Sequence, residues 1–151
     1  MAKYTVNHSC GHEEIHQLYG PGKERQRKIA WLETTPCTEC YRGAQAEART
    51  AANAQAATAN AQTGLPALTG SEKQIAWAET IRRTALIGAD EVRAKAEAFA
   101  AAHPDRAIET APALAHIARA EAETSAAWWI DHRTAECATD LIRRMHTEIT
   151  S

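Results

Sequence analysis

Four metal-ligating side chains in the N-terminal part constrain this chain more than any other feature. Cys10 and His12 form one close pair, and Cys37 and Cys40 form a second pair after an intervening segment. Two such pairs, separated by enough chain to fold back, are how small domains build a tetrahedral zinc site. Four protein ligands leave no open coordination position, so the pattern predicts a structural zinc ion and not a catalytic one.

Two alternatives stay open for this cluster. His8 shares the predicted strand face with Cys10, so it competes with His12 for the fourth position. We favour His12, because it completes a Cys-x-His pair across the turn. The cysteines could also be buried thiols that bind no metal. A redox pair at Cys37 and Cys40 is disfavoured, since no βαβ pattern surrounds them.

The residues around these ligands predict a β-hairpin followed by a helix. Polar and apolar residues alternate over residues 4–10 and again over 15–19, which is typical of two paired strands. Residues 23–34 have helical periodicity, and Pro36 ends that helix. His16 is expected to be a solvated strand residue. No His-Glu-x-x-His motif is present, so the pattern does not favour a metalloprotease.

The rest of the chain is rich in alanine and poor in aromatic residues, which favours helices with a thin core. We therefore predict a mainly α fold in three parts. Residues 1–43 form a zinc-bound, zinc-ribbon-like β-hairpin unit, residues 44–68 an Ala-rich helix or linker, and residues 69–151 a small helical bundle. Within the connector we prefer a helix over residues 42–62.

Cap and breaker residues divide the last part into helices. Ser71 with Gln74 forms a capping-box pattern, and Asp90 and Ser125 are the expected caps of two later helices. Gly88 and Pro104 are the expected helix breaks. Arg82 and Arg83 are expected on the outer face. The predicted core consists of a few large side chains: Trp77, Phe99, Leu114, Ile117, Trp128, Ile130 and Leu141. Such a small core indicates that a homodimer or another partner completes it.

Charge and hydropathy restrict the location and the partners. The formal net charge is −2, so no global field attracts nucleic acid or a membrane. No apolar stretch approaches the roughly 20 residues of a membrane span, and the N-terminus has no hydrophobic signal region. We therefore expect a cytoplasmic protein that does not contact membranes.

Several sequence blocks resemble a zinc-ribbon-like module of uncharacterised small proteins from bacteria, phages and integrative elements. The blocks are Val-Asn-His-Ser-Cys-Gly-His-Glu, Cys-Thr-Glu-Cys-Tyr, Gly-Ser-Glu-Lys-Gln-Ile-Ala-Trp-Ala-Glu and Trp-Trp-Ile-Asp. The resemblance implies a gene carried by mobile elements, with metal ligands at Cys10, Cys37, Cys40 and one of His8 or His12. It implies no reaction.

These observations predict a non-catalytic, zinc-stapled interaction protein that binds a protein partner. A mobile-element origin favours an anti-defence role, for example an inhibitor of the anti-CRISPR type, or an accessory role. The alternative is a nucleic-acid-binding zinc-ribbon protein, since basic residues cluster at 23–28, 82–83 and 143–144. An enzyme is not predicted, because the consecutive Asp131 and His132 point in different directions on a helix.

Overall fold

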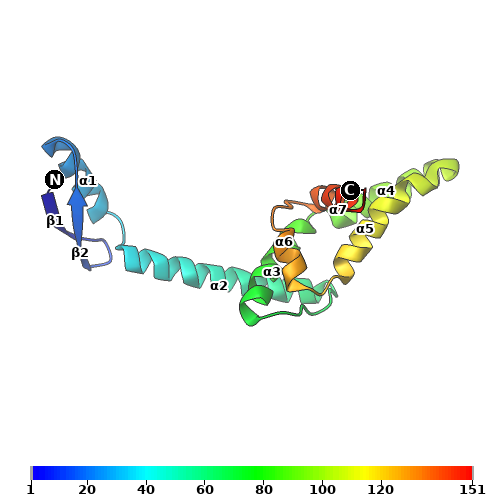
Figure 1. Cartoon of the computed structure of the whole chain (residues 1–151), viewed down its shortest axis with the longest axis horizontal. Coiled ribbons are helices and arrows are strands. Elements are labelled where there is room, and N and C mark those ends of the chain that lie inside the picture. The colour runs from blue at the N-terminus through cyan, green and yellow to red at the C-terminus, as the bar shows by residue number, and fades with distance from the viewer. Residues whose placement is uncertain (1, 151) are drawn as a thin grey trace. The chain divides into compact units, whose positions relative to one another are not determined.

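The computed structural model describes residues 2–150, the last four of them by their backbone, and they are mainly helical (Figure 1). The predicted fold class is confirmed: an N-terminal two-stranded hairpin carries a cluster of three cysteines and one histidine, and helices follow. The chain divides into two compact units, Met1–Arg49 and Thr50–Ser151. Helix α2, Thr38–Gln62, begins in the first unit and ends in the second.

The first unit is a hairpin covered by a helix. Its elements are β1 (Ala2–Asn7), β2 (Glu13–Leu18), α1 (Gly22–Glu33) and the start of α2. The strands are antiparallel, with Tyr4 opposite His16 and Val6 opposite Glu14. Because side chains alternate along a strand, these four residues share one face of the hairpin. His8, two residues beyond Val6, continues the same face.

Helix α1 packs against β1 and ends in a way that positions the second pair of cysteines. Val6 and Leu32 are the large apolar side chains that this unit buries. The hydroxyls of Thr34 and Thr35 donate to carbonyl groups in the last turn of the helix. Pro36 follows and has no amide hydrogen with which to continue the helical pattern. The next residue begins the turn into α2.

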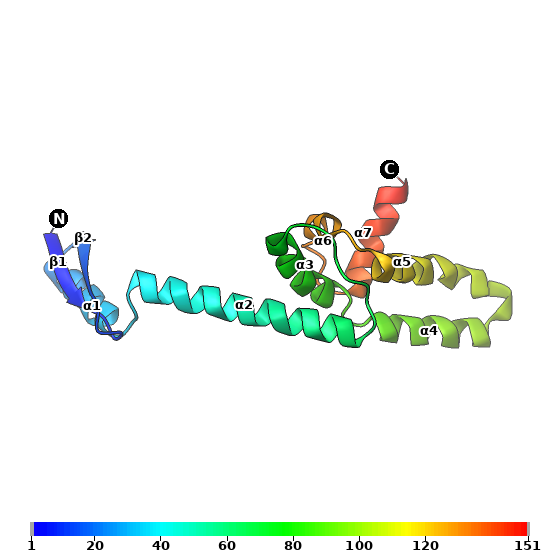
Figure 2. The ribbon, with the colours of Figure 1, turned by 90° about the horizontal axis from the view of Figure 1, so that it is seen from below.

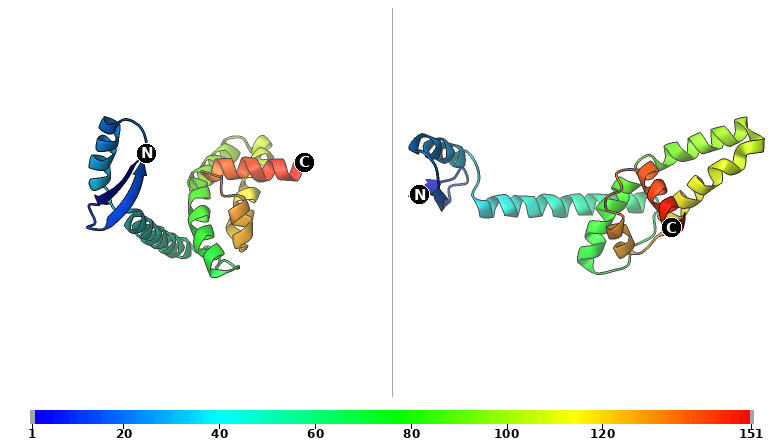
Figure 3. Two further views of the ribbon diagram at one scale, coloured as in Figure 1. Left: turned by 60° about the vertical axis from the view of Figure 1, so that its left-hand side comes forward. Right: turned by 45° about the horizontal axis from the view of Figure 1, so that its top comes forward.

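The second unit contains the end of α2 and six shorter elements. These are α3 (Glu72–Ala85), α4 (Ala89–Ala102), the 3₁₀ helix η1 (Pro104–Thr110), α5 (Ala111–Ala122), α6 (Ala126–Asp131) and α7 (Ala138–Thr150). Helices α4 and α5 lie side by side, with η1 joining them at one end (Figure 2). Helix α3 packs on α6 and α7 (Figure 3). No helix among the described residues has the length and apolarity that a membrane crossing requires.

Small residues dominate the core of the second unit, as the composition predicts. Its main cluster consists of Leu68, Ala78, Ile81, Ala85, Ala120, Ala126, Trp129, Ala135, Leu141 and Met145. The predicted core residues Ile117 and Leu141 are buried, and Phe99, Leu114, Trp128 and Ile130 are partly buried. The prediction that Trp77 belongs to the core was wrong, because its side chain on α3 stays 48% exposed. Trp129 is instead the fully buried tryptophan.

Two of the predicted caps are confirmed and one is wrong. The Ser71 hydroxyl accepts a hydrogen bond from the Gln74 amide, and the Gln74 side chain accepts one from the Ser71 amide. Ser125 caps α6 in the predicted way. Asp90, however, lies inside the first turn of α4, because the left-handed Gly88 precedes that helix. Glycine adopts this conformation without steric cost, so it can take the cap position.

The expectation for Arg82 was also wrong, because its side chain points into the unit and is only 1% exposed. Its Nη2 lies 2.9 Å from a carboxylate oxygen of Glu79, and its Nη1 donates to the carbonyl of Pro66. Asn60 of α2 donates to the same Glu79 carboxylate at 2.6 Å. This buried polar network joins the end of α2 to α3, so the end of the Ala-rich segment packs within the second unit.

Candidate metal centre

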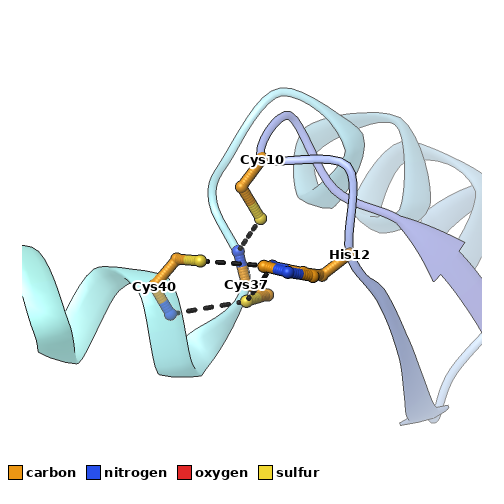
Figure 4. Close-up of side chains that lie close together, drawn as sticks. All are labelled: Cys10, His12, Cys37 and Cys40. Carbon is orange, nitrogen blue, oxygen red and sulfur yellow. Dashed lines mark hydrogen bonds between the residues drawn. The ribbon is translucent and has the colours of Figure 1, made fainter.

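The structure brings together the four predicted ligands Cys10, His12, Cys37 and Cys40 (Figure 4). The first two come from the loop between β1 and β2. Cys37 directly precedes α2, and Cys40 lies in the first turn of that helix. One donor atom from each of the four residues lies within 4.8 Å of all the others. A cluster with this geometry could hold a metal ion.

The separations between the donor atoms agree with tetrahedral coordination. The Nδ1 atom of His12 lies 3.2 Å from the sulfur of Cys40 and 3.7 Å from that of Cys37. Bonds of about 2.3 Å to sulfur and about 2.0 Å to nitrogen place tetrahedral sulfur and nitrogen ligands about 3.5 Å apart. Only small side-chain adjustments would therefore bring the atoms to bonding distance from one central ion.

The tight loop at the hairpin end explains why Cys10 and His12 lie side by side. The amide of Gly11 donates to the carbonyl of His8 at 2.8 Å, and the amide of His8 donates to the carbonyl of His12 at 2.9 Å. Gly11 has a φ of +81°, a left-handed conformation that a residue with a Cβ adopts only at a cost. A glycine between the two ligands therefore lets the chain reverse there.

Backbone amides around the cluster favour a thiolate at Cys10. The amide of Cys37 lies 3.2 Å from its sulfur, and this hydrogen bond, with one from the His12 amide, lowers the pKa of Cys10 to about 6. The side-chain hydrogen bond of Cys40 to the sulfur of Cys37, in which the Cys40 thiol is the donor, is the main cause that raises the pKa of Cys40 to about 11, and burial adds to it. The protein alone thus favours one thiolate and disfavours a second beside it. A divalent cation would let all of these thiols ionise together.

Glu14 joins the hairpin to α2 directly beside this cluster. Its carboxylate accepts hydrogen bonds from the amide of Thr38 at 3.1 Å and from the Thr38 hydroxyl at 3.0 Å. These bonds hold the pKa of Glu14 below its usual range, mainly through the Thr38 amide. A carboxylate at the start of a helix also interacts favourably with the helix dipole. The start of α2, which carries Cys40, is therefore held in place next to the hairpin.

His8 belongs to a second group of side chains and not to the cysteine cluster. Its Nδ1 lies 3.0 Å from the carbonyl of Thr35, and its Nε2 lies 3.0 Å from the Nε2 of His16. His16 is therefore partly buried and bonded, so its assignment as a solvated strand residue was wrong. Glu14 completes this second group. The i, i+2 spacing of Glu14 and His16 on one strand face was the sequence signal that could have revealed it.

The other sequence candidates belong to the second unit. In the second unit, His132 is buried, stacks on Trp128 with ring centroids 3.8 Å apart, and bonds through Nδ1 to the Trp128 carbonyl. Asp131 and Arg133 are exposed on either side of it. The structure therefore shows His132 packed on Trp128, between two exposed charged residues.

Comparisons of the chain with protein-family models, with curated proteins and with solved structures found no match. The resemblance to zinc-ribbon-like proteins of mobile elements therefore stays a prediction, and the site is defined by its own geometry.

Proposed function

We propose that this chain is a non-catalytic interaction protein whose N-terminal unit is held together by a structural zinc ion and binds a protein partner. The observation that carries the proposal is the convergence of three thiols and one imidazole within 4.8 Å. Zinc suits this donor set, because it accepts sulfur and nitrogen ligands in tetrahedral geometry. With four protein ligands, such an ion has no position left for a substrate.

The packing of the first unit supports a structural role for the ion. Val6 and Leu32 are the large buried apolar side chains among residues 2–49, so the hydrophobic core of this unit is very small. Domains of this size usually need a metal or disulfides to compensate for such a core. Zinc would tie the hairpin loop to the start of α2 and so fix the shape of the unit.

The surface beside the hairpin supports a protein partner. Trp31 and Tyr41 are 53% and 54% exposed, and with Pro36 they line a cavity of about 370 Å³. Tryptophan and tyrosine are enriched in the cores of protein interfaces, because they bury a large apolar area and retain a polar group. We name Trp31, Pro36 and Tyr41 the aromatic surface, and propose it as the contact region.

The class of partner rests on the sequence blocks described above. Their resemblance to mobile-element proteins supports an anti-defence inhibitor, of the anti-CRISPR type for example, or an accessory factor that acts on a host complex. The nucleic-acid alternative has less support from the side-chain contacts. Arg82 is buried against Glu79, and Arg143 and Arg144 bond to Asp140.

The first test is elemental analysis of the purified protein. We expect zinc in the wild type, and we expect the Cys10→Ser variant to lose the ion of the cysteine cluster. The Cys137→Ser variant is the matched control, since this cysteine lies in the second unit. Protein that contains no zinc and whose thiols all react would contradict the metal assignment.

The second test is capture of host proteins on the immobilised full-length chain. Trp31→Ala should abolish capture of a specific partner, whereas Ile108→Ser should not, although Ile108 is also highly exposed at 80%. Retention of the partner by the Trp31 variant would show that the aromatic surface is not the contact region. Light scattering of the same samples would reveal a homodimer.

A further inference from the structure

Beside the cysteine cluster, His8, Glu14 and His16 present three donor atoms to one point in space. The Nε2 atoms of the two histidines lie 3.0 Å apart, and an oxygen of Glu14 lies 3.6 Å from the first and 3.8 Å from the second. We propose that these three side chains form a second binding site, for a divalent transition-metal ion, independent of the four cysteine-cluster ligands.

The size of the triangle matches metal coordination. A circle through three atoms separated by 3.0, 3.6 and 3.8 Å has a radius of about 2.0 Å. Zinc lies about 2.0–2.1 Å from histidine nitrogen and about 2.0–2.2 Å from carboxylate oxygen. An ion at or slightly above the centre of the triangle therefore reaches normal bond lengths without any change of rotamer.

The surroundings fix the ligands in the state that metal binding needs. The Nδ1 of His8 faces the carbonyl of Thr35, an acceptor, so Nδ1 carries the proton and Nε2 presents its lone pair toward the site. A histidine ligand whose other nitrogen donates to a carbonyl is the usual arrangement at metal sites. The side chain of His8 is only 2% exposed, which holds its ring in one orientation.

Glu14 is preorganised as well. Its carboxylate is oriented by the amide and the hydroxyl of Thr38, and each carboxylate oxygen keeps a lone pair for a metal ion. In the protein without metal, Nε2 of His16 donates a hydrogen bond to Nε2 of His8. When a metal ion binds, the proton of His16 moves to its Nδ1, so that the Nε2 atoms of both rings present lone pairs to one centre.

The remaining coordination position lies open. Both imidazoles line the cavity of about 370 Å³ whose wall includes Trp31 and Tyr41. The cavity has room for a water molecule as the fourth ligand. Two imidazoles and one carboxylate suit zinc, cobalt or nickel, whereas magnesium and calcium prefer oxygen ligands. This site therefore differs from the cysteine cluster both in donor chemistry and in its open position.

A cobalt titration of the reduced, metal-free full-length protein tests the proposal, because cobalt distinguishes the two donor sets. Cobalt in the cysteine cluster gives thiolate-to-metal charge-transfer absorption, whereas cobalt bound by two histidines and a glutamate gives only ligand-field bands. We expect two equivalents to bind, of which one adds ligand-field bands without charge transfer. If the protein binds only one equivalent of cobalt in total, and that equivalent gives the full charge-transfer absorption, the proposal is overturned.

Two pairs of variants locate the second ion. His16→Gln and Glu14→Gln should each bind one equivalent fewer and keep the charge-transfer band, which reports an intact cysteine cluster. The controls His103→Gln and Glu13→Gln should bind the same number as the wild type. A His16 variant that still binds two equivalents would refute the assignment. Absence of the charge-transfer band from the wild type would instead count against the cysteine site alone.

A measurement on the wild type removes the dependence on variant folding. In long-range proton–nitrogen spectra recorded during a zinc titration, the Nε2 resonances of His8 and His16 should both shift with the same equivalent. Resonances that stay unchanged after two equivalents would overturn the proposal.

Discussion

The Glu79→Ala substitution should strongly destabilise the second unit, because it leaves the buried guanidinium of Arg82 without its counter-charge. Arg82 is 1% exposed, and its Nη2 lies 2.9 and 3.1 Å from the two carboxylate oxygens of Glu79. The carboxylate also accepts a hydrogen bond from Asn60 at 2.6 Å. The substitution therefore removes the negative partner of a charge that water does not reach.

The magnitude follows from the burial of the pair. Removing one member of a buried ion pair typically costs about 3–5 kcal/mol. Asn60 keeps its hydrogen bond to the backbone carbonyl of residue 79, at 2.9 Å. The loss of its second hydrogen bond, to the carboxylate, therefore adds little to the cost. In domains of 60–100 residues each kcal/mol lowers the melting temperature by about 4–8 °C. We therefore expect a decrease of at least roughly 12 °C.

Thermal unfolding of the full-length protein, followed by circular dichroism and by tryptophan fluorescence, to which the buried Trp129 contributes, measures this change. Glu97→Ala on the exposed side of α4 is the matched control, and its effect should stay within about 0.5 kcal/mol. Replacing the pair together, by Glu79→Leu and Arg82→Met, should restore most of the stability, since apolar residues leave no charge unpaired. A loss below about 1 kcal/mol for Glu79→Ala would refute the reasoning.

Three further predictions concern the metal, a cap and a titrating group. Chelation or Cys37→Ser should remove hydrogen-exchange protection from β1 and β2 but not from the helices of the second unit. The control Cys137→Ser should leave the protection of β1 and β2 unchanged. Ser71→Ala should lower the stability by about 1 kcal/mol in urea unfolding, whereas Ser71→Asp, which keeps the cap, should not. The hydrogen bond from Arg144 holds the pKa of Asp140 below its usual 3.8. The ionised carboxylate therefore stabilises the fold above pH 3.8, and this stabilisation is lost as the pH falls below that value. Asp140→Asn should therefore reduce the loss of stability between neutral pH and roughly pH 3, and an unchanged pH profile would contradict this assignment.

The cysteine cluster could be predicted because its signal is local. Ligand pairs at short spacing, each next to a turn-forming residue, need only one long-range event to meet: the return of the chain from the hairpin to the start of α2. The choice of His12 over His8 rested on the same local spacing, and the structure places the His12 ring beside the sulfurs of Cys37 and Cys40.

The second group has a weaker signal in the sequence than the cysteine cluster, because it depends on strand register and on a contact with a distant turn. Glu14 and His16 share a strand face, but only the pairing of β1 with β2 turns that face toward His8. The bond from His8 to Thr35 depends on how α1 packs against the hairpin. Periodicity assigned His16 to solvent because a half-buried strand face gives no sign of what covers it.

Helix type and helix limits were determined by the sequence itself, through alanine content, the Ser71 and Ser125 caps, and the breaks at Gly88 and Pro104. These features act within a few residues, so they need no tertiary information. The tertiary structure decided which side of each helix is buried. In α3 it buried Arg82 and left Trp77 half exposed, because the carboxylate of Glu79 and the carbonyl of Pro66 accept hydrogen bonds from the guanidinium inside the unit. Burial of this ion pair also needs Pro66 and Asn60, which lie outside α3 and satisfy its remaining hydrogen bonds, and their positions exist only once the chain has folded.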